Sequence, residues 1–279
     1  MKYKIVVDSC CELPEELKKD DRFEIVSLEI EVGNHRLVDD ETFDQADFLK
    51  KVAAASDCPK SSCPSPDSYM ESYRTEAEHV YVVTLSSKLS GSYNSAVLGI
   101  DLYHETYGEK SIYVVDSWSA SGGELQLALK AMELEEMGTY SFEEIVRQLD
   151  DYRNNMNTYF VLDNLDTLRK NGRLTGVKAL VATTLSIKPV MGAKEGVIVQ
   201  HSQAVGIKKG LKKMAELSIS KVVNPEQRRL IITHCNNLGR AELVRDFILS
   251  KVSFKETIIL DTAGISSLYA NDGGVILTM

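Results

Sequence analysis

Two apolar runs in the first half of the chain constrain the fold more than any other feature. Residues 79–85 and 111–115 are nearly continuous apolar stretches of strand length. The first ends in a serine-rich turn and the second in Asp116-Ser117, and a helical pattern follows each. Such runs are typical of parallel strands buried on both faces of a sheet. Repeated strand, loop and helix indicate βαβ units, so we expect an α/β fold.

The remaining elements are assigned from periodicity and turn residues. In the first half we expect a strand at 3–7, one alternating strand at 24–32 with a hairpin into 36–38, a loop at 57–66, and helices at 41–55, 67–78, 92–107 and 122–137. In the second half we expect helices at 142–155, 164–171, 177–184, 207–221 and 238–251, and strands at 158–162, 187–191, 197–200, 229–233, 257–261 and 274–278. The change of pattern predicts two domains, 1–155 and 156–279.

Composition excludes several classes of protein. The 279 residues carry a formal net charge of −9, which argues against a nucleic-acid surface but leaves room for one anionic small ligand. We expect no signal peptide and no membrane-spanning segment. The five cysteines are odd in number and form no CxxC pair, which favours a reducing cytoplasm. A zinc site formed by Cys10, Cys11, Cys58 and Cys63 is the less favoured alternative to small buried hydrophobic side chains.

The chemistry is expected at the carboxyl ends of the parallel strands, where ligands bind in such sheets. Serine-bearing turns follow Val7, Leu85 and Val115. After Leu85 the chain runs through Ser90, Gly91 and Ser92 into a helix, whose free N–H groups and hydroxyls could cradle a carboxylate or phosphate. Simple capping of that helix by a serine is an equally good interpretation.

Two further segments offer polar groups. Ser61 and Ser62 lie in a proline-stiffened stretch that could hold hydroxyls toward a ligand, although a surface turn is favoured on composition alone. Arg173 follows Gly172 after a short helix and could pair with a carboxylate, although an ordinary helix end with an exposed arginine is favoured.

Catalytic motifs are missing from the sequence. There is no GxSxG, HExxH, P-loop or GxGxxG pattern, and none of the five histidines has an obvious partner. A chain poor in catalytic groups and rich in hydroxyl donors at strand ends is more typical of a binding protein than of an enzyme.

Six segments, in order, resemble the bacterial DegV family. The chain has Val6-Val7-Asp8-Ser9 before Glu12-Leu13-Pro14, and Lys60-Ser61-Ser62-Cys63-Pro64-Ser65 is similar to the family's Lys-Thr-Ser-Gln-Pro-Ser. Ser90-Gly91-Ser92-Tyr93-Asn94-Ser95-Ala96 is similar to Ser-Gly-Thr-Tyr-Gln-Ser-Ala, and Asp116-Ser117, Gly172-Arg173-Leu174 and Ile187-Lys188-Pro189 complete the series. The resemblance covers residues 3 to about 200.

The resemblance implies an N-terminal α/β domain with a parallel sheet and a C-terminal α/β domain with a largely antiparallel sheet. It also implies a long-chain fatty acid such as palmitate in an apolar tunnel, with no other cofactor and no metal. Ser61, Ser90 and Arg173 would hold the carboxylate, and the adjacent Ser62 and Ser92 complete the expected set. The protein would be a cytoplasmic carrier, monomeric by default and in transient contact with membranes, that presents the lipid to a separate fatty acid kinase.

The C-terminal segment departs from the family. Many members have a His-x-Gly-Pro-Gly segment whose histidine helps to hold the carboxylate, whereas this chain has Tyr269-Ala270-Asn271-Asp272-Gly273. Either Tyr269 or Asn271 would have to donate instead. Two rival functions stay open here: an enzyme for a small carboxylated or phosphorylated substrate, and a regulatory protein whose lipid is structural.

Overall fold

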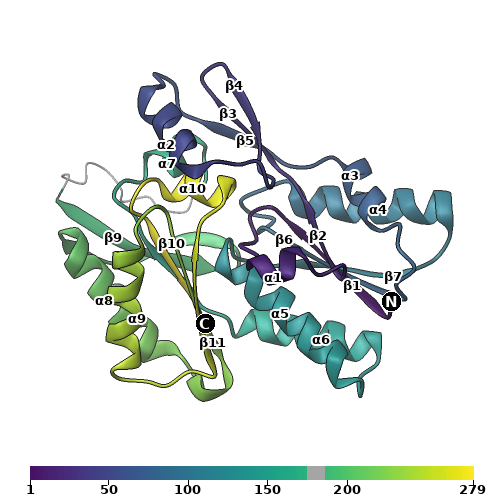
Figure 1. The fold of residues 1–279 in the computed structure, drawn as a ribbon. Helices are drawn as coiled ribbons and strands as arrows, with labels where there is room; N and C mark the ends of the chain where they lie inside the picture. Colours follow the sequence, from purple (N-terminus) through teal and green to yellow (C-terminus); the bar gives the residue numbers. More distant parts are fainter. Residues whose placement is uncertain (175–185) are drawn as a thin grey trace.

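Three sheets organise the protein in a computed structural model that describes residues 1–174 and 186–279 (Figure 1). Sheet A has the order β2 (Phe23–Val26), β1 (Tyr3–Asp8), β6 (His79–Thr84) and β7 (Ser111–Asp116), and all its pairs are parallel. The predicted N-terminal parallel sheet is therefore confirmed. The serine-bearing turns after β1, β6 and β7 all leave the same edge of this sheet.

Both faces of sheet A are covered by helices, as Figure 1 shows. Alternate strand residues point to opposite faces. Val6, Val80 and Val82 pack against α3 (Pro66–Ser72) and α4 (Ser92–Tyr107). Ile5 and Val83 pack on the other face, against α5 (Gly122–Met137) and α6 (Phe142–Asn154). This two-sided burial is the physical reason for the continuous apolar runs in the sequence.

Sheet B is small and was only partly predicted. It has the order β4 (His35–Val38), β3 (Glu29–Val32) and β5 (Lys60–Ser62), with antiparallel pairs. The prediction of one strand at 24–32 is wrong, because the chain leaves sheet A after Val26 and enters sheet B at Glu29. The backbone N–H of Leu28 donates to Ser9 Oγ at this break, a tertiary contact that alternation does not reveal. The predicted loop at 57–66 is likewise wrong where it contains β5.

Sheet C is built from the second half of the chain. Its order is β10 (Val197–Val205), β9 (Ile187–Lys194), β8 (Thr158–Val161), β13 (Val275–Thr278), β11 (Arg229–His234) and β12 (Glu256–Asp261). Only the β11–β12 pair is parallel, so the prediction of a largely antiparallel sheet is confirmed. Helices α8 (Ile207–Lys221) and α9 (Leu238–Leu249) cover one face.

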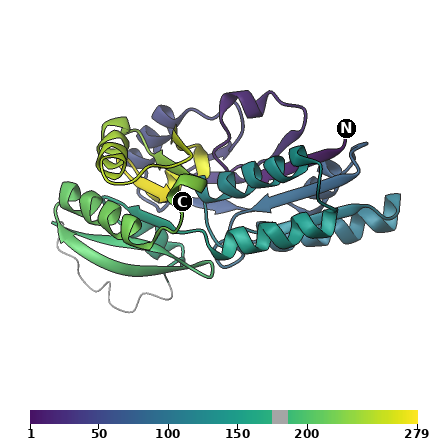
Figure 2. The same cartoon turned by 90° about the horizontal axis from the view of Figure 1, so that it is seen from below.

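Helix α5 joins the two halves. It packs on sheet A, while Gln126 donates to the backbone carbonyls of Arg229 and Thr278 in sheet C. Most of its residues are buried, as expected for a helix enclosed by two layers. Figure 2 shows α5 and α6 running along sheet A, with the C-terminal half, in green and yellow, at the left end of the view.

The short helices complete the structure. They are α1 (Glu15–Lys18), α2 (Gln45–Ala54), α7 (Asp166–Lys170), α10 (Gly264–Ala270) and the 3-10 turn η1 (Pro225–Gln227). Helix α2 begins later than predicted because Asp44 caps it, and α3 ends at Ser72 instead of continuing to residue 78. Helix α10 was not predicted. The helical pattern expected at 177–184 lies outside the described residues.

No helix within residues 1–174 and 186–279 is both long enough and apolar enough to cross a bilayer.

Candidate ligand-binding site

A cavity of about 330 Å³ lies where sheet A, sheet B, sheet C and α10 meet. Its size falls in the range of small-molecule and cofactor sites. Most of its wall is apolar and comes from both halves of the chain: Leu28, Leu85, Leu89, Ala120, Phe160, Leu162, Leu168, Ala193, Ile198, Ile265, Ala270 and Ile276. Such a wall favours a ligand with a long apolar part.

A polar cluster occupies part of the wall, and we define it as Ser61, Ser62, Ser90, Arg173 and Tyr269. The hydroxyls of Ser61 and Tyr269 are 2.9 Å apart, and either can donate. The Arg173 guanidinium carbon lies 5.7 Å from the centre of the Tyr269 ring. Four of the five sequence-predicted ligand residues are thus brought to one cavity, and Tyr269 joins them.

Arg173 is fixed in place by backbone contacts. Its Nε donates to the carbonyl of Leu89 over 3.1 Å, and its Nη1 donates to the carbonyl of Asn171. It forms no ion pair with any acidic residue of the described chain. A positive charge on an apolar cavity that no acidic side chain of residues 1–174 and 186–279 neutralises favours an anionic ligand.

Ser92 has a different position from the other predicted ligand residues. It is buried and does not line the cavity, and its Oγ lies 3.0 Å from Ser90 Oγ. Ser90 Oγ also accepts from the Ser92 backbone N–H over 3.2 Å. The N-cap of α4 is Gly91, without a side-chain cap, so capping by Ser90 or Ser92 is not what the structure has; Ser90 Oγ instead accepts from the first N–H of the helix and lines the cavity.

Gly91 permits the close approach of two segments of the wall. A Cβ atom at this position would lie 2.8 Å from Cys63 Sγ. The stretch after β5 thereby packs directly on the turn after β6, which brings Ser61 and Ser62 to the same cavity as Ser90.

Helix α10 carries Tyr269 and is held by side chains from the N-terminal half. Asp39 accepts from the backbone N–H groups of Gly264 and Ile265 over 2.7 and 2.8 Å. Glu12 accepts from the N–H of Ala263 over 2.8 Å. These three donors would otherwise be orphaned at the helix start. Helix α10 was not predicted because the side chains that cap it lie more than 200 residues earlier in the sequence.

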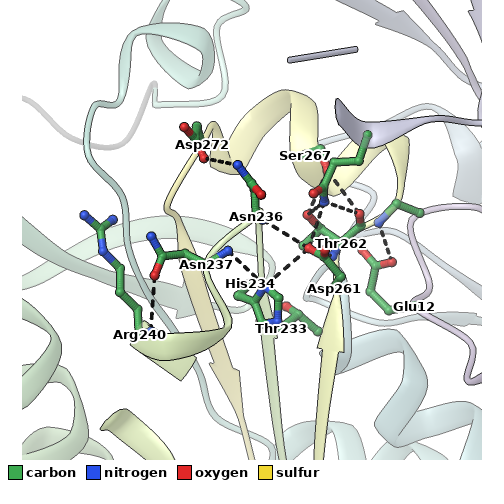
Figure 3. A network of polar contacts seen from close by, with 12 residues as sticks. Glu12, Thr233, His234, Asn236, Asn237, Arg240, Asp261, Thr262, Ser267 and Asp272 are labelled. Atoms are coloured by element: carbon green, nitrogen blue, oxygen red, sulfur yellow. Dashed lines mark hydrogen bonds and ion pairs between the residues drawn. The ribbon is translucent and has the colours of Figure 1, made fainter. Parts of the chain in front are cut away.

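A surface network continues this anchor (Figure 3). Gln45 of α2 donates to Asp261 Oδ1 and to the Thr262 carbonyl, both over 2.8 Å. His234 Nδ1 lies 3.3 Å from Asp261 Oδ1. The network links α2, β11 and β12 at the start of α10. It therefore fixes the position of this part of the cavity wall, although Gln45, His234 and Asp261 do not line the cavity themselves.

Several carboxyl groups beside the cavity are fully buried. Burial raises the pKa of Glu12 to about 8 and that of Asp39 to about 6. Burial also raises the pKa of Asp8 and, far above its usual range, that of Glu124. Asp8, Cys10 and Glu124 place one ligand atom each within 4.8 Å of one another, which is the arrangement in the described chain that could surround a metal ion. Both Asp8 oxygens already accept backbone N–H groups, from Cys10 and Leu85, whereas neither Glu124 oxygen has a hydrogen-bond partner within the described residues.

The cysteines follow the prediction only in part. Cys10 and Cys11 are buried, as expected, whereas Cys58 is half-buried and Cys63 is exposed, so the expectation of burial is wrong for these two. Cys63 lies at the cavity wall beside Gly91.

The fold and site define an α/β protein with a largely apolar cavity and one polar, cationic patch. A family model described as "Uncharacterised protein, DegV family" matches residues 2–276. A DegV domain-containing protein of Streptococcus gordonii is 34% identical over 280 residues, covering 99% of this chain and 98% of that protein. The chain therefore belongs to the DegV family.

Solved structures of similar proteins contain fatty acids. A DegV family protein of Ruminococcus gnavus, refined with vaccenic acid, is 51% identical with a TM-score of 0.97 and covers 100% of this chain and 99% of its own. A Eubacterium eligens DegV protein loaded with heptadecanoic acid is 27% identical, with a TM-score of 0.89 and coverage of 99% and 98%. The Streptococcus pneumoniae Fatty Acid Kinase (Fak) B3 protein, loaded with linoleic acid, is 31% identical, with a TM-score of 0.84 and coverage of 100% and 99%.

Proposed function

We propose that this protein binds one long-chain fatty acid in the cavity and carries it to a separate fatty acid kinase. The observation that carries the proposal is the pairing of an apolar cavity with an arginine that has no acidic partner in the described chain. The fatty acids in the similar structures from R. gnavus, E. eligens and S. pneumoniae agree with this ligand class.

The apolar wall would supply most of the binding free energy. Each buried methylene contributes roughly 0.8 kcal/mol, so about 14 methylenes of a palmitoyl chain represent about 11 kcal/mol of transfer free energy. Part of this is lost to immobilisation of the ligand. The carboxylate then needs donors, because an unpaired charge at an apolar site is costly.

The polar cluster would hold the carboxylate. Ser61, Ser62 and Ser90 offer hydroxyl donors, and Arg173 offers the charge. Ser92 would not contact the ligand itself but would orient the Ser90 hydroxyl through their hydrogen bond. Between the two candidates for the missing histidine we favour Tyr269, which lines the cavity, over Asn271, whose side chain bonds to Thr167 and to the Tyr269 carbonyl.

The proposal also covers the domains of the protein, its cellular location and its oligomeric state. Residues 1–155 and 156–279 would act as two domains that close around the lipid, since both contribute to the cavity wall. We infer a cytoplasmic monomer that touches membranes only to take up or release its lipid. The transferred phosphate and its chemistry would belong to the kinase, and this protein would present the carboxylate.

Gentle extraction and mass analysis of small molecules from the purified protein tests the proposal. We expect one fatty acid per protein molecule, with a chain of about 14 to 18 carbons (C14 to C18), because each buried methylene adds to the binding free energy. A protein that is empty and also takes up no added fatty acid would refute the proposal. The double variant Ser61→Ala with Ser90→Ala should bind fatty acid more weakly, and unchanged affinity would exclude the proposed carboxylate site.

A further inference from the structure

A second set of hydroxyls lines the cavity outside the polar cluster. Ser119, which follows β7, and Thr158, the first residue of β8, both belong to the cavity wall. Their Oγ and Oγ1 atoms are 2.6 Å apart, and the two residues are 2% and 8% exposed. Neither forms a hydrogen bond with a member of the polar cluster, among the contacts of the described residues. We call these two residues the hydroxyl pair.

The surroundings of the hydroxyl pair are apolar. Thr158 and Phe160 point to the same face of β8, because strand side chains alternate with a period of two. Ile276 lies directly opposite Phe160 on β13 and also lines the cavity. An unmodified acyl chain would need only such carbon atoms at this part of the wall. The mutual hydrogen bond satisfies the pair within the apolar surroundings, and the pair still offers polar atoms to a ligand.

The hydrogen-bonding capacity of the pair is asymmetric. Two hydroxyls carry two protons and four lone pairs. Either hydroxyl can donate in the mutual bond. When Thr158 donates to Ser119, Ser119 donates to the carbonyl oxygen of Ala120, 3.4 Å from Ser119 Oγ. In this arrangement both protons are used and acceptor lone pairs are left over, so the pair accepts a hydrogen bond from a ligand.

A third hydroxyl strengthens the polar character of this side of sheet C. Thr278 lies opposite Thr158 in the β8–β13 register and so faces the same side of the sheet. Its Oγ1 is buried and has no hydrogen-bond partner within the described part of the chain. Thr278 does not line the cavity: a Cβ at Gly122 of α5 would lie 3.2 Å from its Oγ1, so this hydroxyl packs behind the hydroxyl pair, against α5.

We propose that the cavity accepts fatty acids that carry a hydroxyl group on the acyl chain, and that the hydroxyl pair accepts a hydrogen bond from that group. The inference rests on the proposed fatty-acid function and names a substrate class for the same cavity. A ligand hydroxyl can donate to the pair, whereas a ligand ketone can only accept. The cavity should thus distinguish hydroxylated fatty acids both from the plain acid and from the oxo acid of the same length.

The test compares stearate with a panel of hydroxystearates, in which the hydroxyl stands at successive chain positions, and with the matching oxostearates. Dissociation constants are measured on delipidated wild-type protein and on Thr158→Val, Ser119→Ala and Thr158→Ser. At least one hydroxystearate should bind wild type about three- to tenfold more tightly than stearate, the range of one neutral hydrogen bond. The matching oxostearate should show no advantage.

The variants decide whether the hydroxyl pair is responsible. The preference is the dissociation constant of stearate divided by that of the hydroxystearate. It should fall to about one in Thr158→Val and Ser119→Ala, and it should be retained in Thr158→Ser, which keeps the hydroxyl. The melting temperature of each variant verifies that it is folded, and Ser119→Ala is the removal variant if Thr158→Val does not fold. The inference is overturned if no hydroxystearate is preferred, or if the preference survives in both Thr158→Val and Ser119→Ala. Failure of wild type to bind any acid of the panel would instead refute the proposed function.

Discussion

Replacing Tyr269 by phenylalanine should weaken fatty-acid binding by about 10- to 100-fold. The change removes one oxygen, which lies 2.9 Å from Ser61 Oγ, and leaves the ring in its contacts with neighbouring apolar side chains of α2 and α7. A hydrogen bond to a charged group contributes about 1.5–3 kcal/mol, and each 1.4 kcal/mol corresponds to a tenfold change in the dissociation constant. The ring stays in place, so the free energy of unfolding should change by less than about 1 kcal/mol.

The assay is a titration of delipidated protein with palmitate, with unfolding in urea as the measure of stability. Tyr107→Phe is a matched control, because it removes the same atom from an exposed tyrosine of α4. Asn271→Gly tests the alternative donor and tolerates the positive φ of 57° at that position. Wild-type affinity in Tyr269→Phe, together with weakened binding in Asn271→Gly, would refute the assignment of Tyr269 as the head-group donor.

Three other perturbations test the site and its anchor. Arg173→Ala should weaken palmitate binding about 10- to 100-fold and reduce its salt dependence, whereas Arg169→Ala, which removes an exposed arginine of α7, should leave the titration curve in place. Burial raises the pKa of Glu12 from 4.5 to about 8. The free energy of unfolding therefore contains the full contribution of Glu12 below pH 4.5. This contribution is lost as the pH rises toward 8, by about 1.4 kcal/mol per pH unit. Urea unfolding between pH 5 and 9 should therefore show a smaller loss of stability in Glu12→Gln than in wild type, and identical slopes would contradict the burial of a titrating Glu12. Gly264→Ala should lower stability by about 1–3 kcal/mol because its Cβ would lie 2.6 Å from Asp39 Oδ1, whereas Gly239→Ala has open space and should be nearly neutral; equal effects of the two would argue against the Asp39 contact.

Local pattern was sufficient wherever an element is defined by its own residues. The apolar runs of β6 and β7 predicted a parallel sheet, because burial on both faces leaves a direct trace in composition. Helices α4, α5 and α8 have the bounds that periodicity predicted. The serine turns were placed at one edge of sheet A by topology alone, and Ser90 does line the cavity there.

Local pattern failed where distant groups decide the structure. The division of 24–32 into β2 and β3 depends on different partner strands for Val26 and Glu29, while the alternation from Val26 to Val32 continues across the break. Strand β5 is held by backbone pairing with β3, and its sequence Lys-Ser-Ser has no strand preference of its own. Helix α10 starts at a glycine and receives its caps from Glu12 and Asp39.

The α/β class, the family resemblance and four polar residues of the cavity wall, Ser61, Ser62, Ser90 and Arg173, were accessible from the sequence alone. Three contacts required the folded structure: Tyr269 with Ser61, Ser92 with Ser90, and Ser119 with Thr158 across the two halves. The physical reason is that periodicity and turn chemistry act over a few residues, whereas a binding cavity is made by contacts between segments far apart in the chain, whose free energy appears only when they pack together.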